Sequence, residues 1–193
     1  MITSSIMRSL DPDEVIMIRM KRIRAVRVKG KREIESLTRG VVLINWVQES
    51  PEKVQSAPLH WRIGLWNKPP IDIEIDAADG HLRGLQIVLQ DEAITAKIPA
   101  PISHQVLSGL PDFDVTKWPL TDRYLDEIAD VTVAWTSSDD LLVLFTPQSP
   151  GIAMECEVHP SASLLFDEGK RLVGLRLPSI TAEEKAVLRK AVE

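Results

Sequence analysis

Apolar and polar residues alternate along many short segments of this chain, and the alternation predicts β-strands. In residues 71–76, three isoleucines alternate with three carboxylates, so one face of the strand would be buried and the other exposed to water. Similar segments recur between turn-forming residues. The expected strands span residues 40–47, 59–66, 71–76, 81–89, 131–136, 141–145, 152–158, 162–166 and 171–177.

Three further segments complete the pattern. Residues 21–29 mix apolar and basic positions without a helical period, which favours a strand that contains a bulge. Residues 91–129 contain four prolines and are expected to cross between two halves of the molecule, with a short helix near residues 121–129. Near the C-terminus, Thr181 and Glu184 form a capping box that predicts a final helix.

Two stretches of the sequence match each other. Residues 71–87 and 162–177 each place an aspartate before a turn, a glycine within it and the pattern Leu-x-Gly-Leu after it. The offset between the two copies is 167 − 76 = 91 residues before the turn and 172 − 82 = 90 residues after it. This self-similarity predicts two related β units.

We therefore expect a mainly β protein, in the β-rich α+β class, with two related antiparallel β units and a C-terminal helix. The expected parts are a first β unit with a basic N-terminal strand (1–90), a proline-rich crossing segment (91–129) and a second β unit with the helix (130–193). One compact domain that contains both units is also compatible with this length.

The matched stretch resembles small bacterial β-domains of unknown function. The residues that carry the resemblance are Asp76, Gly80 and 82–87 in the first copy and Asp167, Gly169 and 172–177 in the second. After Gly-Leu that family usually has an acidic residue, whereas this chain has Gln86 and Arg176. The resemblance covers about 17 residues per copy. It implies a small mixed β fold and no particular activity.

The composition is typical of a globular protein and excludes a disordered chain, a collagen-like fibre and a small disulfide-stapled protein. Of the 193 residues, 44% are hydrophobic and 26% charged, which is enough apolar material for an ordinary core. The single cysteine, Cys156, excludes an internal disulfide, and its place on the apolar side of a strand predicts that it is buried. No apolar run approaches the ~18 residues of a membrane span, and the start lacks a basic segment followed by an apolar one. We expect a cytoplasmic protein without a membrane anchor, a metal or a cofactor.

Basic residues are concentrated in one strip near the N-terminus. The net charge is −5, from 23 basic and 28 acidic residues; without the eight basic residues of the strip it would be 15 − 28 = −13. Two interpretations stay open, a basic strand beside acidic neighbours in a sheet and a site for the phosphates of a nucleic acid. The strip consists of Arg19, Lys21, Arg22, Arg24, Arg27, Lys29, Lys31 and Arg32.

Carboxylates on the polar side of strand 71–76 continue into the following turn and predict an acidic face. A tryptophan on the polar side of its strand, or within the crossing segment, would provide an aromatic contact for a partner. The residues expected to bind a partner are Asp72, Glu74, Asp76, Asp79, Trp66, Trp118, Asp139 and Asp140.

The sequence contains no phosphate-binding loop, nucleophile motif or zinc-binding helix motif, and we predict no catalytic residue. We expect a non-catalytic binding protein that covers a basic site on a partner protein with its acidic face, as an immunity protein covers a toxin domain. The alternative is a protein that associates with nucleic acid through the basic strip. A third hypothesis is an unrecognised hydrolase, because carboxylates two residues apart on a strand approach the separation found in glycosidases.

Overall fold

The computed structural model describes residues 18–26, 29–38, 41–48, 57–64, 71–90, 94–99, 103, 105–116, 118, 122–145 and 151–190. These residues form fifteen β-strands and one α-helix. The predicted fold class, mainly β with a C-terminal helix, is confirmed. Two of the residues named above, Trp66 and Arg27, lie outside the described residues.

One sheet has six strands in the order β10-β4-β5-β6-β3-β2. Its five strands from β2 to β6 pair antiparallel, and β10 is added parallel to β4 at one edge. The strands are β2 (Gly30–Thr38), β3 (Val41–Gln48), β4 (Leu59–Gly64), β5 (Ile71–Ile75), β6 (Leu82–Gln90) and β10 (Tyr124–Ile128).

A second sheet has seven strands in the order β7-β11-β12-β15-β14-β13-β8. Both of its outermost strands, β7 and β8, pair parallel with their neighbours, and the five inner strands are antiparallel. The strands are β7 (Ile94–Ile98), β8 (Gln105–Ser108), β11 (Thr132–Thr136), β12 (Leu141–Leu144), β13 (Met154–His159), β14 (Ala162–Phe166) and β15 (Leu172–Leu177).

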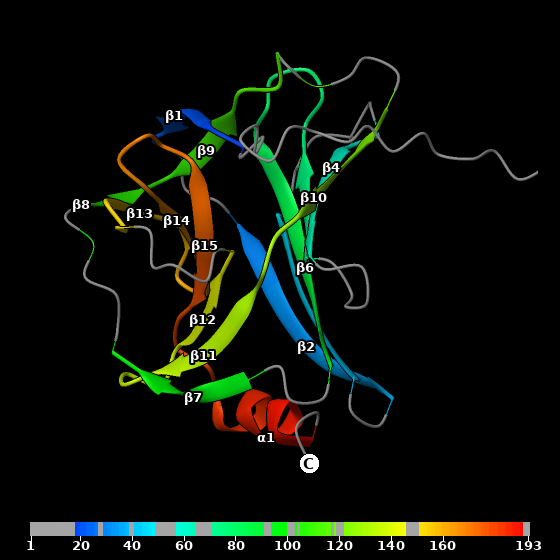
Figure 1. Ribbon diagram of the computed structural model, residues 1–193, viewed down its shortest axis with the longest axis vertical. Helices are drawn as coiled ribbons and strands as arrows, with labels where there is room; N and C mark the ends of the chain where they lie inside the picture. The colour runs from blue at the N-terminus through cyan, green and yellow to red at the C-terminus, as the bar shows by residue number, and fades with distance from the viewer. Residues whose placement is uncertain are drawn as a thin grey trace, which may run out of the picture.

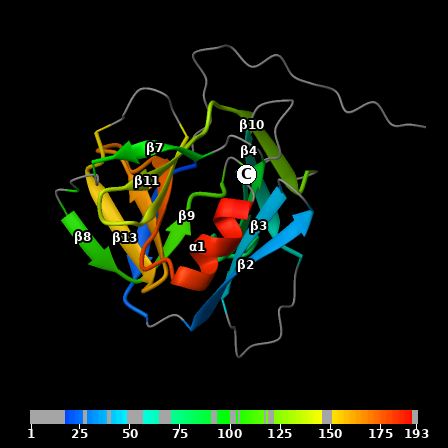
Figure 2. The same cartoon turned by 90° about the horizontal axis from the view of Figure 1, so that it is seen from below.

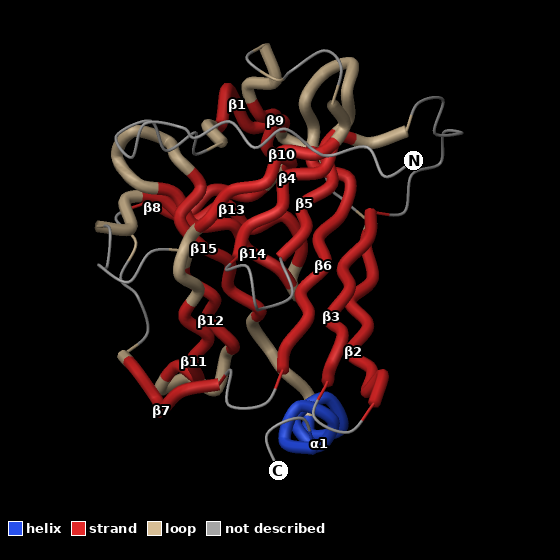
Figure 3. The backbone as a smooth tube through the Cα atoms, turned by 45° about the vertical axis from the view of Figure 1, so that its right-hand side comes forward, coloured by secondary structure: helices blue, strands red, loops and turns tan. Residues whose placement is uncertain are grey.

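The two sheets face each other across a shared apolar core (Figures 1 and 3). Trp61 of the six-stranded sheet meets Phe145, which follows β12, edge to face with ring centroids 6.0 Å apart. A short sheet of β1 (Met20–Arg24) and β9 (Leu110–Phe113) lies at one end of this core, and Phe113 packs against Phe166. Helix α1 (Ala182–Lys190) lies at the opposite end, as the view from below shows (Figure 2).

All nine strands expected from the alternation are present. Each of these strands buries an apolar side in the shared core, because such burial provides most of the stabilisation that a strand contributes. In β12, β14 and β15 the opposite side is apolar as well, and its residues Leu142, Leu144, Leu165 and Val173 form a second buried cluster. Trp46 and Trp61 are fully buried, and so is Cys156, as predicted. Burial raises the pKa of the Cys156 thiol to about 12, and Glu155 adds to the shift, so this cysteine is not a reactive thiolate at neutral pH.

The strands β2–β6 and β11–β15 follow the same spatial order. The first run is ordered β4-β5-β6-β3-β2 and the second β13-β14-β15-β12-β11. Their hairpins also share a register: Glu74 pairs with Gly84, Leu165 pairs with Gly174, and each hairpin has an irregularity next to these pairs. This correspondence agrees with the predicted duplication, which itself stays a prediction.

The crossing segment differs from the expectation. Instead of an irregular crossing with one helix, its described parts form β7, β8, β9 and β10, and residues 124–128 are a strand where a helix was predicted. Pairing with β4 explains the strand, because it satisfies the backbone groups of β10 and buries the inward side of an alternating segment. The added parallel edge strands also make both sheets mixed rather than purely antiparallel.

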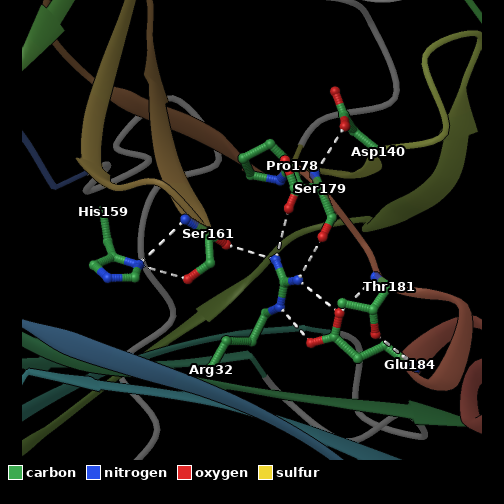
Figure 4. Close-up of polar contacts among 8 residues, drawn as sticks. All are labelled: Arg32, Asp140, His159, Ser161, Pro178, Ser179, Thr181 and Glu184. Carbon is green, nitrogen blue, oxygen red and sulfur yellow. Dashed lines mark hydrogen bonds and ion pairs between the residues drawn. The ribbon is translucent and has the colours of Figure 1, made fainter.

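Arg32 connects the six-stranded sheet to the C-terminal helix (Figure 4). Its side chain is 5% exposed, and its guanidinium donates to Glu184 in two hydrogen bonds of 2.7 and 2.8 Å. It also donates to the backbone oxygens of Ser161, Pro178 and Ser179. Glu184 accepts a hydrogen bond from the backbone N–H of Thr181 and its own N–H donates to the Thr181 hydroxyl, so the predicted capping box is confirmed.

Helix α1 has nine residues, and no helix among the described residues is long and apolar enough to cross a membrane.

Candidate binding surface on the six-stranded sheet

The outward side of the six-stranded sheet carries two rows of cross-strand neighbours that run over all six strands. We call these twelve residues the polar sheet face. The first row is Tyr124, His60, Glu74, Gly84, Val47 and Lys31, and the second is Asp126, Arg62, Asp72, Gln86, Asn45 and Glu33. The rows are continuous because the register of each strand pair places the outward residues opposite one another.

One end of the polar sheet face is an aromatic and charged cluster. The Arg62 guanidinium lies 4.6 Å from the centre of the Tyr124 ring and donates to Asp126 in hydrogen bonds of 2.5 and 2.7 Å. Those hydrogen bonds raise the pKa of Arg62 further, against the effect of burial, so it is a permanent cation. His60 stacks on Tyr124 at 4.8 Å, and its Nδ1 lies 3.0 Å from an oxygen of Asp72. Tyr124 is nevertheless 53% exposed, so part of its side chain is available to contact a partner.

The middle of the polar sheet face is built around a glycine. A side chain at Gly84 would meet a carboxylate oxygen of Glu74 at 3.4 Å, so the Glu74 side chain lies across the adjacent strand. Beside it, the amide of Gln86 donates to Asn45 at 3.2 Å, and Val47 is 54% exposed. These side chains form a low surface on which a partner could pack closely.

Acidic groups outnumber basic groups on this side of the sheet. When Glu35, the next outward residue of β2, is included, this side carries five carboxylates and two cations, Arg62 and Lys31. The net charge is then 2 − 5 = −3 if His60 is neutral. Lys31 pairs with Glu33, and Arg62 with Asp126, so Asp72, Glu74 and Glu35 account for the net charge. The five carboxylates are Asp72, Glu74, Asp126, Glu33 and Glu35.

The predicted acidic face is only partly correct. Asp72 and Glu74 lie on the polar sheet face as expected, but Asp76 is buried and forms an ion pair with Arg83 at 2.6 Å. Asp79 is in the turn beyond the sheet, 2.7 Å from Arg24. Burial opposes ionisation there, but hydrogen bonds from Arg24 and His81 outweigh it, and the pKa of Asp79 is well below its usual range.

The second predicted acidic pair is elsewhere. Asp140 is 5% exposed, and Arg176 lies 3.0 Å from it and 3.0 Å from Glu155. Asp139, beside it, is exposed with a φ of 63° and lies 3.3 Å from Lys185. Neither residue is part of the polar sheet face, so the idea of one exposed surface formed by all six acids is wrong.

Of the two tryptophans predicted as aromatic contacts, only Trp118 is among the described residues. Trp118 is half-buried, packs against the core and donates from Nε1 to the backbone oxygen of Asp122 at 3.0 Å. Trp66 lies outside the described residues. Tyr124 is an exposed aromatic residue on this face, and sequence reasoning missed it because the segment was expected to be helical. The segment did carry a strand signal, because the exposed residues Tyr124, Asp126 and Ile128 alternate with the half-buried Leu125 and Glu127.

The basic strip does not form one surface. Arg22 and Arg24 of β1 each lie 2.6 Å from Asp112 of β9, whose side chain is 1% exposed, and Arg32 is used internally as described above. Arg19, Lys21 and Lys29 are exposed, and Lys31 belongs to the polar sheet face. The pairing of Arg22 and Arg24 with Asp112 is the neighbour arrangement that the first interpretation of the strip expected.

One group of possible metal ligands was not foreseen. Atoms of Asp76, Asp79 and His81 lie within 4.8 Å of one another in the turn between β5 and β6. Arg83 and Arg24 already pair with the two carboxylates, so the negative charge of this group has protein partners. We attach no metal function to it.

The chain matches no protein-family model and no curated protein sequence. The resemblance to small bacterial β-domains therefore stays a prediction.

Proposed function

We propose that this protein is a non-catalytic binding protein that uses the polar sheet face to contact a basic partner protein. The observation that carries the proposal is the continuous pair of rows across six strands, with an exposed tyrosine at one end and a net charge of 2 − 4 = −2, or −3 when the adjacent Glu35 is included. A cytoplasmic inhibitor or immunity protein, which covers the basic active site of a toxin domain, is the specific form that this function takes.

Charge complementarity supports a basic partner. Carboxylates in excess on an open surface accelerate association with a positively charged protein and disfavour other acidic proteins. Asp72 and Glu74 are half-buried at the centre of the face, where water would be displaced on binding. Their contribution is therefore larger than that of charges at the rim.

The cluster around Tyr124 supports a defined contact point. Tyrosine and arginine are among the residue types that most often dominate binding energy, and here the Tyr124 ring contacts both the Arg62 guanidinium and the His60 ring. A side chain already held in place loses little conformational entropy on binding. The Tyr124 side chain is thus already ordered for insertion into a pocket of the partner.

The test is affinity capture from the native host with three forms of the protein. The first is wild type, the second carries Asp72→Asn, Glu74→Gln and Tyr124→Ala, and the third carries Glu168→Gln and Glu183→Gln, which remove two exposed charges outside the face. We expect wild type and the third form to retain the same basic protein and the second form to lose it.

The captured protein is then purified and its activity measured with and without this chain. Inhibition at equal concentrations supports the inhibitor role. Retention of the partner by all three forms would show that the polar sheet face is not the binding surface. Retention of an acidic protein alone would contradict the proposed charge complementarity.

A further inference from the structure

A hollow of about 380 Å³ lies at the end of the molecule where β1 and the turn between β14 and β15 meet, away from the rows of the polar sheet face. This volume is within the range of small-ligand sites. The lining residues are Arg19, Met20, Lys21, Asp114, Thr116, Gly169 and Lys170.

Three segments that are far apart in the sequence build the hollow, and backbone hydrogen bonds hold them together. The Met20 N–H donates to the Lys170 oxygen at 2.9 Å, and the Asp114 N–H donates to the Arg19 oxygen at 2.9 Å. On the other side of Lys170, the Leu172 N–H donates to the Ile18 oxygen at 3.0 Å. The backbone at Arg19, Met20, Asp114 and Lys170 is therefore held in place by the fold itself.

The hollow gathers cations that have no charged partner among the described residues. Arg19, Lys21 and Lys170 form no ion pair and no side-chain hydrogen bond among the described residues. Neighbouring arginines differ, since Arg22 pairs with Asp112 and Arg171 pairs with Asp167 at 2.6 Å. Three like charges around one hollow repel one another, and an anion between them would remove that cost.

The backbone is irregular at both lysines that line the hollow, Lys21 and Lys170. The register of β1 against β9 shifts between Met20 and Arg22, so Lys21 is the extra residue of a bulge. Lys170 has a φ of 60°, in the left-handed region that a lysine rarely adopts. Bulges and left-handed non-glycine residues concentrate at binding sites, where the surrounding structure maintains them.

One carboxylate also lines the hollow and limits which anions fit. Asp114 accepts hydrogen bonds from the backbone N–H and the hydroxyl of Thr116, at 3.0 and 2.6 Å, which spread part of its charge. The three cations against this one acid leave a net charge of 3 − 1 = +2. A dianion matches that charge better than a carboxylate or chloride does.

We propose that this hollow binds the phosphate group of a phosphorylated small molecule. A phosphate monoester is a dianion near neutral pH, and its three terminal oxygens can accept hydrogen bonds from the three cationic side chains at once. The site is independent of the polar sheet face, because none of its residues belongs to that face.

The test is a titration of the full chain with inorganic phosphate at pH 7.5, followed by amide chemical shifts, with sodium chloride of equal ionic strength as the reference. We expect saturable shifts at Lys21, Thr116, Gly169 and Lys170. Lys170→Gln and Arg19→Gln should each weaken phosphate affinity roughly two- to fivefold, the range for one exposed ion pair. Lys29→Gln removes the same charge from an exposed position outside the hollow and should leave the affinity unchanged.

A further variant, Asp114→Asn, tests the site by a gain of phosphate affinity. Asp114→Asn keeps an oxygen that can accept from Thr116 but removes the one negative charge of the hollow, so it should tighten phosphate binding roughly two- to fivefold. Unchanged shifts up to the concentration limit, or equal weakening by Lys29→Gln, would overturn the proposal. Binding of a single-stranded oligonucleotide with no response to inorganic phosphate would also overturn it.

Discussion

The indole Nε1 of Trp61 donates a hydrogen bond of 2.9 Å to a carboxylate oxygen of Glu127. The two residues lie on neighbouring parallel strands, and both point into the core, where Trp61 is 1% exposed. Burial raises the pKa of Glu127 to about 7, although the hydrogen bond from Trp61 acts in the opposite direction. The edge strand β10, which also carries Tyr124, is therefore joined to β4 by a side-chain hydrogen bond as well as by backbone pairing, and the carboxyl group of that bond has a pKa near neutral pH.

This carboxyl group makes stability depend on pH in a defined direction. The pKa of Glu127 is higher in the folded protein than its ordinary value of 4.5, so the folded state binds more protons between these two values. The free energy of unfolding should therefore fall as pH rises from about 4.5 to 7, and the total fall should be roughly 1–3 kcal/mol. Glu127→Gln keeps an acceptor for Trp61 and should reduce this fall. Urea unfolding at pH 5 and pH 8 measures it.

The control for Glu127→Gln is Asp126→Asn, on the same strand but on the outward side. Asp126 is exposed and pairs with Arg62, so the control should leave the fall between pH 5 and pH 8 largely as in wild type. An equal pH dependence in wild type and Glu127→Gln would show that Glu127 is ionised in the folded protein throughout this range.

Replacement of Arg32 should destabilise the protein strongly. Arg32→Lys keeps the charge, but an ammonium group cannot make the two parallel hydrogen bonds to Glu184 and still reach three backbone oxygens. We expect the free energy of unfolding to fall by roughly 2–4 kcal/mol, since a buried ion pair loses part of its geometry. Arg123→Lys, at an exposed position, is the control and should change it by less than about 0.5 kcal/mol. A change below about 1 kcal/mol for Arg32→Lys would contradict the structural role.

The glycines of the two matched hairpins should differ in how well they accept a methyl group. A side chain at Gly174 would lie 2.6 Å from the backbone oxygen of Val143, whereas one at Gly84 would lie 3.2 Å from that of Trp46. Gly174→Ala should therefore cost roughly 1–3 kcal/mol and Gly84→Ala less, because a neighbouring strand must move further for Gly174. Thermal unfolding provides the comparison.

The reference for both glycine variants is Gly151→Ala, where nothing lies within 4 Å of the added methyl group. It should be neutral or slightly stabilising. If Gly174→Ala and Gly151→Ala unfold at the same temperature, the close approach of β12 to β15 is not as the structure places it.

Partner binding should separate into two kinetic effects. Asp72→Asn with Glu74→Gln should slow association with the captured basic partner about threefold to tenfold and weaken its dependence on salt, because these carboxylates attract the partner at a distance. Tyr124→Ala should mainly speed dissociation, by about thirtyfold if it contributes the ~2 kcal/mol of a dominant contact. Surface plasmon resonance at two salt concentrations measures both rates.

The kinetic prediction has its own control. Glu168→Gln with Glu183→Gln changes the net charge by the same amount at exposed positions outside the polar sheet face. If this pair slows association as much as Asp72→Asn with Glu74→Gln does, the overall charge, and not the polar sheet face, attracts the partner.

The sequence by itself determined the elements whose signals are local. The period-two alternation around Trp61 and Ile73 identified strands and their buried sides, because a residue's side of a strand depends only on its position along it. The capping box of Thr181 and Glu184 identified the start of α1, because both partners lie within one turn.

Only the tertiary structure decided which charges face a partner. Asp72 and Asp76 look alike in the sequence, but Asp76 lies where Arg83 can neutralise it and Asp72 lies on the outward side of a central strand. Likewise, Tyr124 reaches His60 through a parallel pairing of strands more than sixty residues apart. Such pairings depend on the order of strands in a sheet, which is set by how the whole core closes and leaves no periodic signal in either segment.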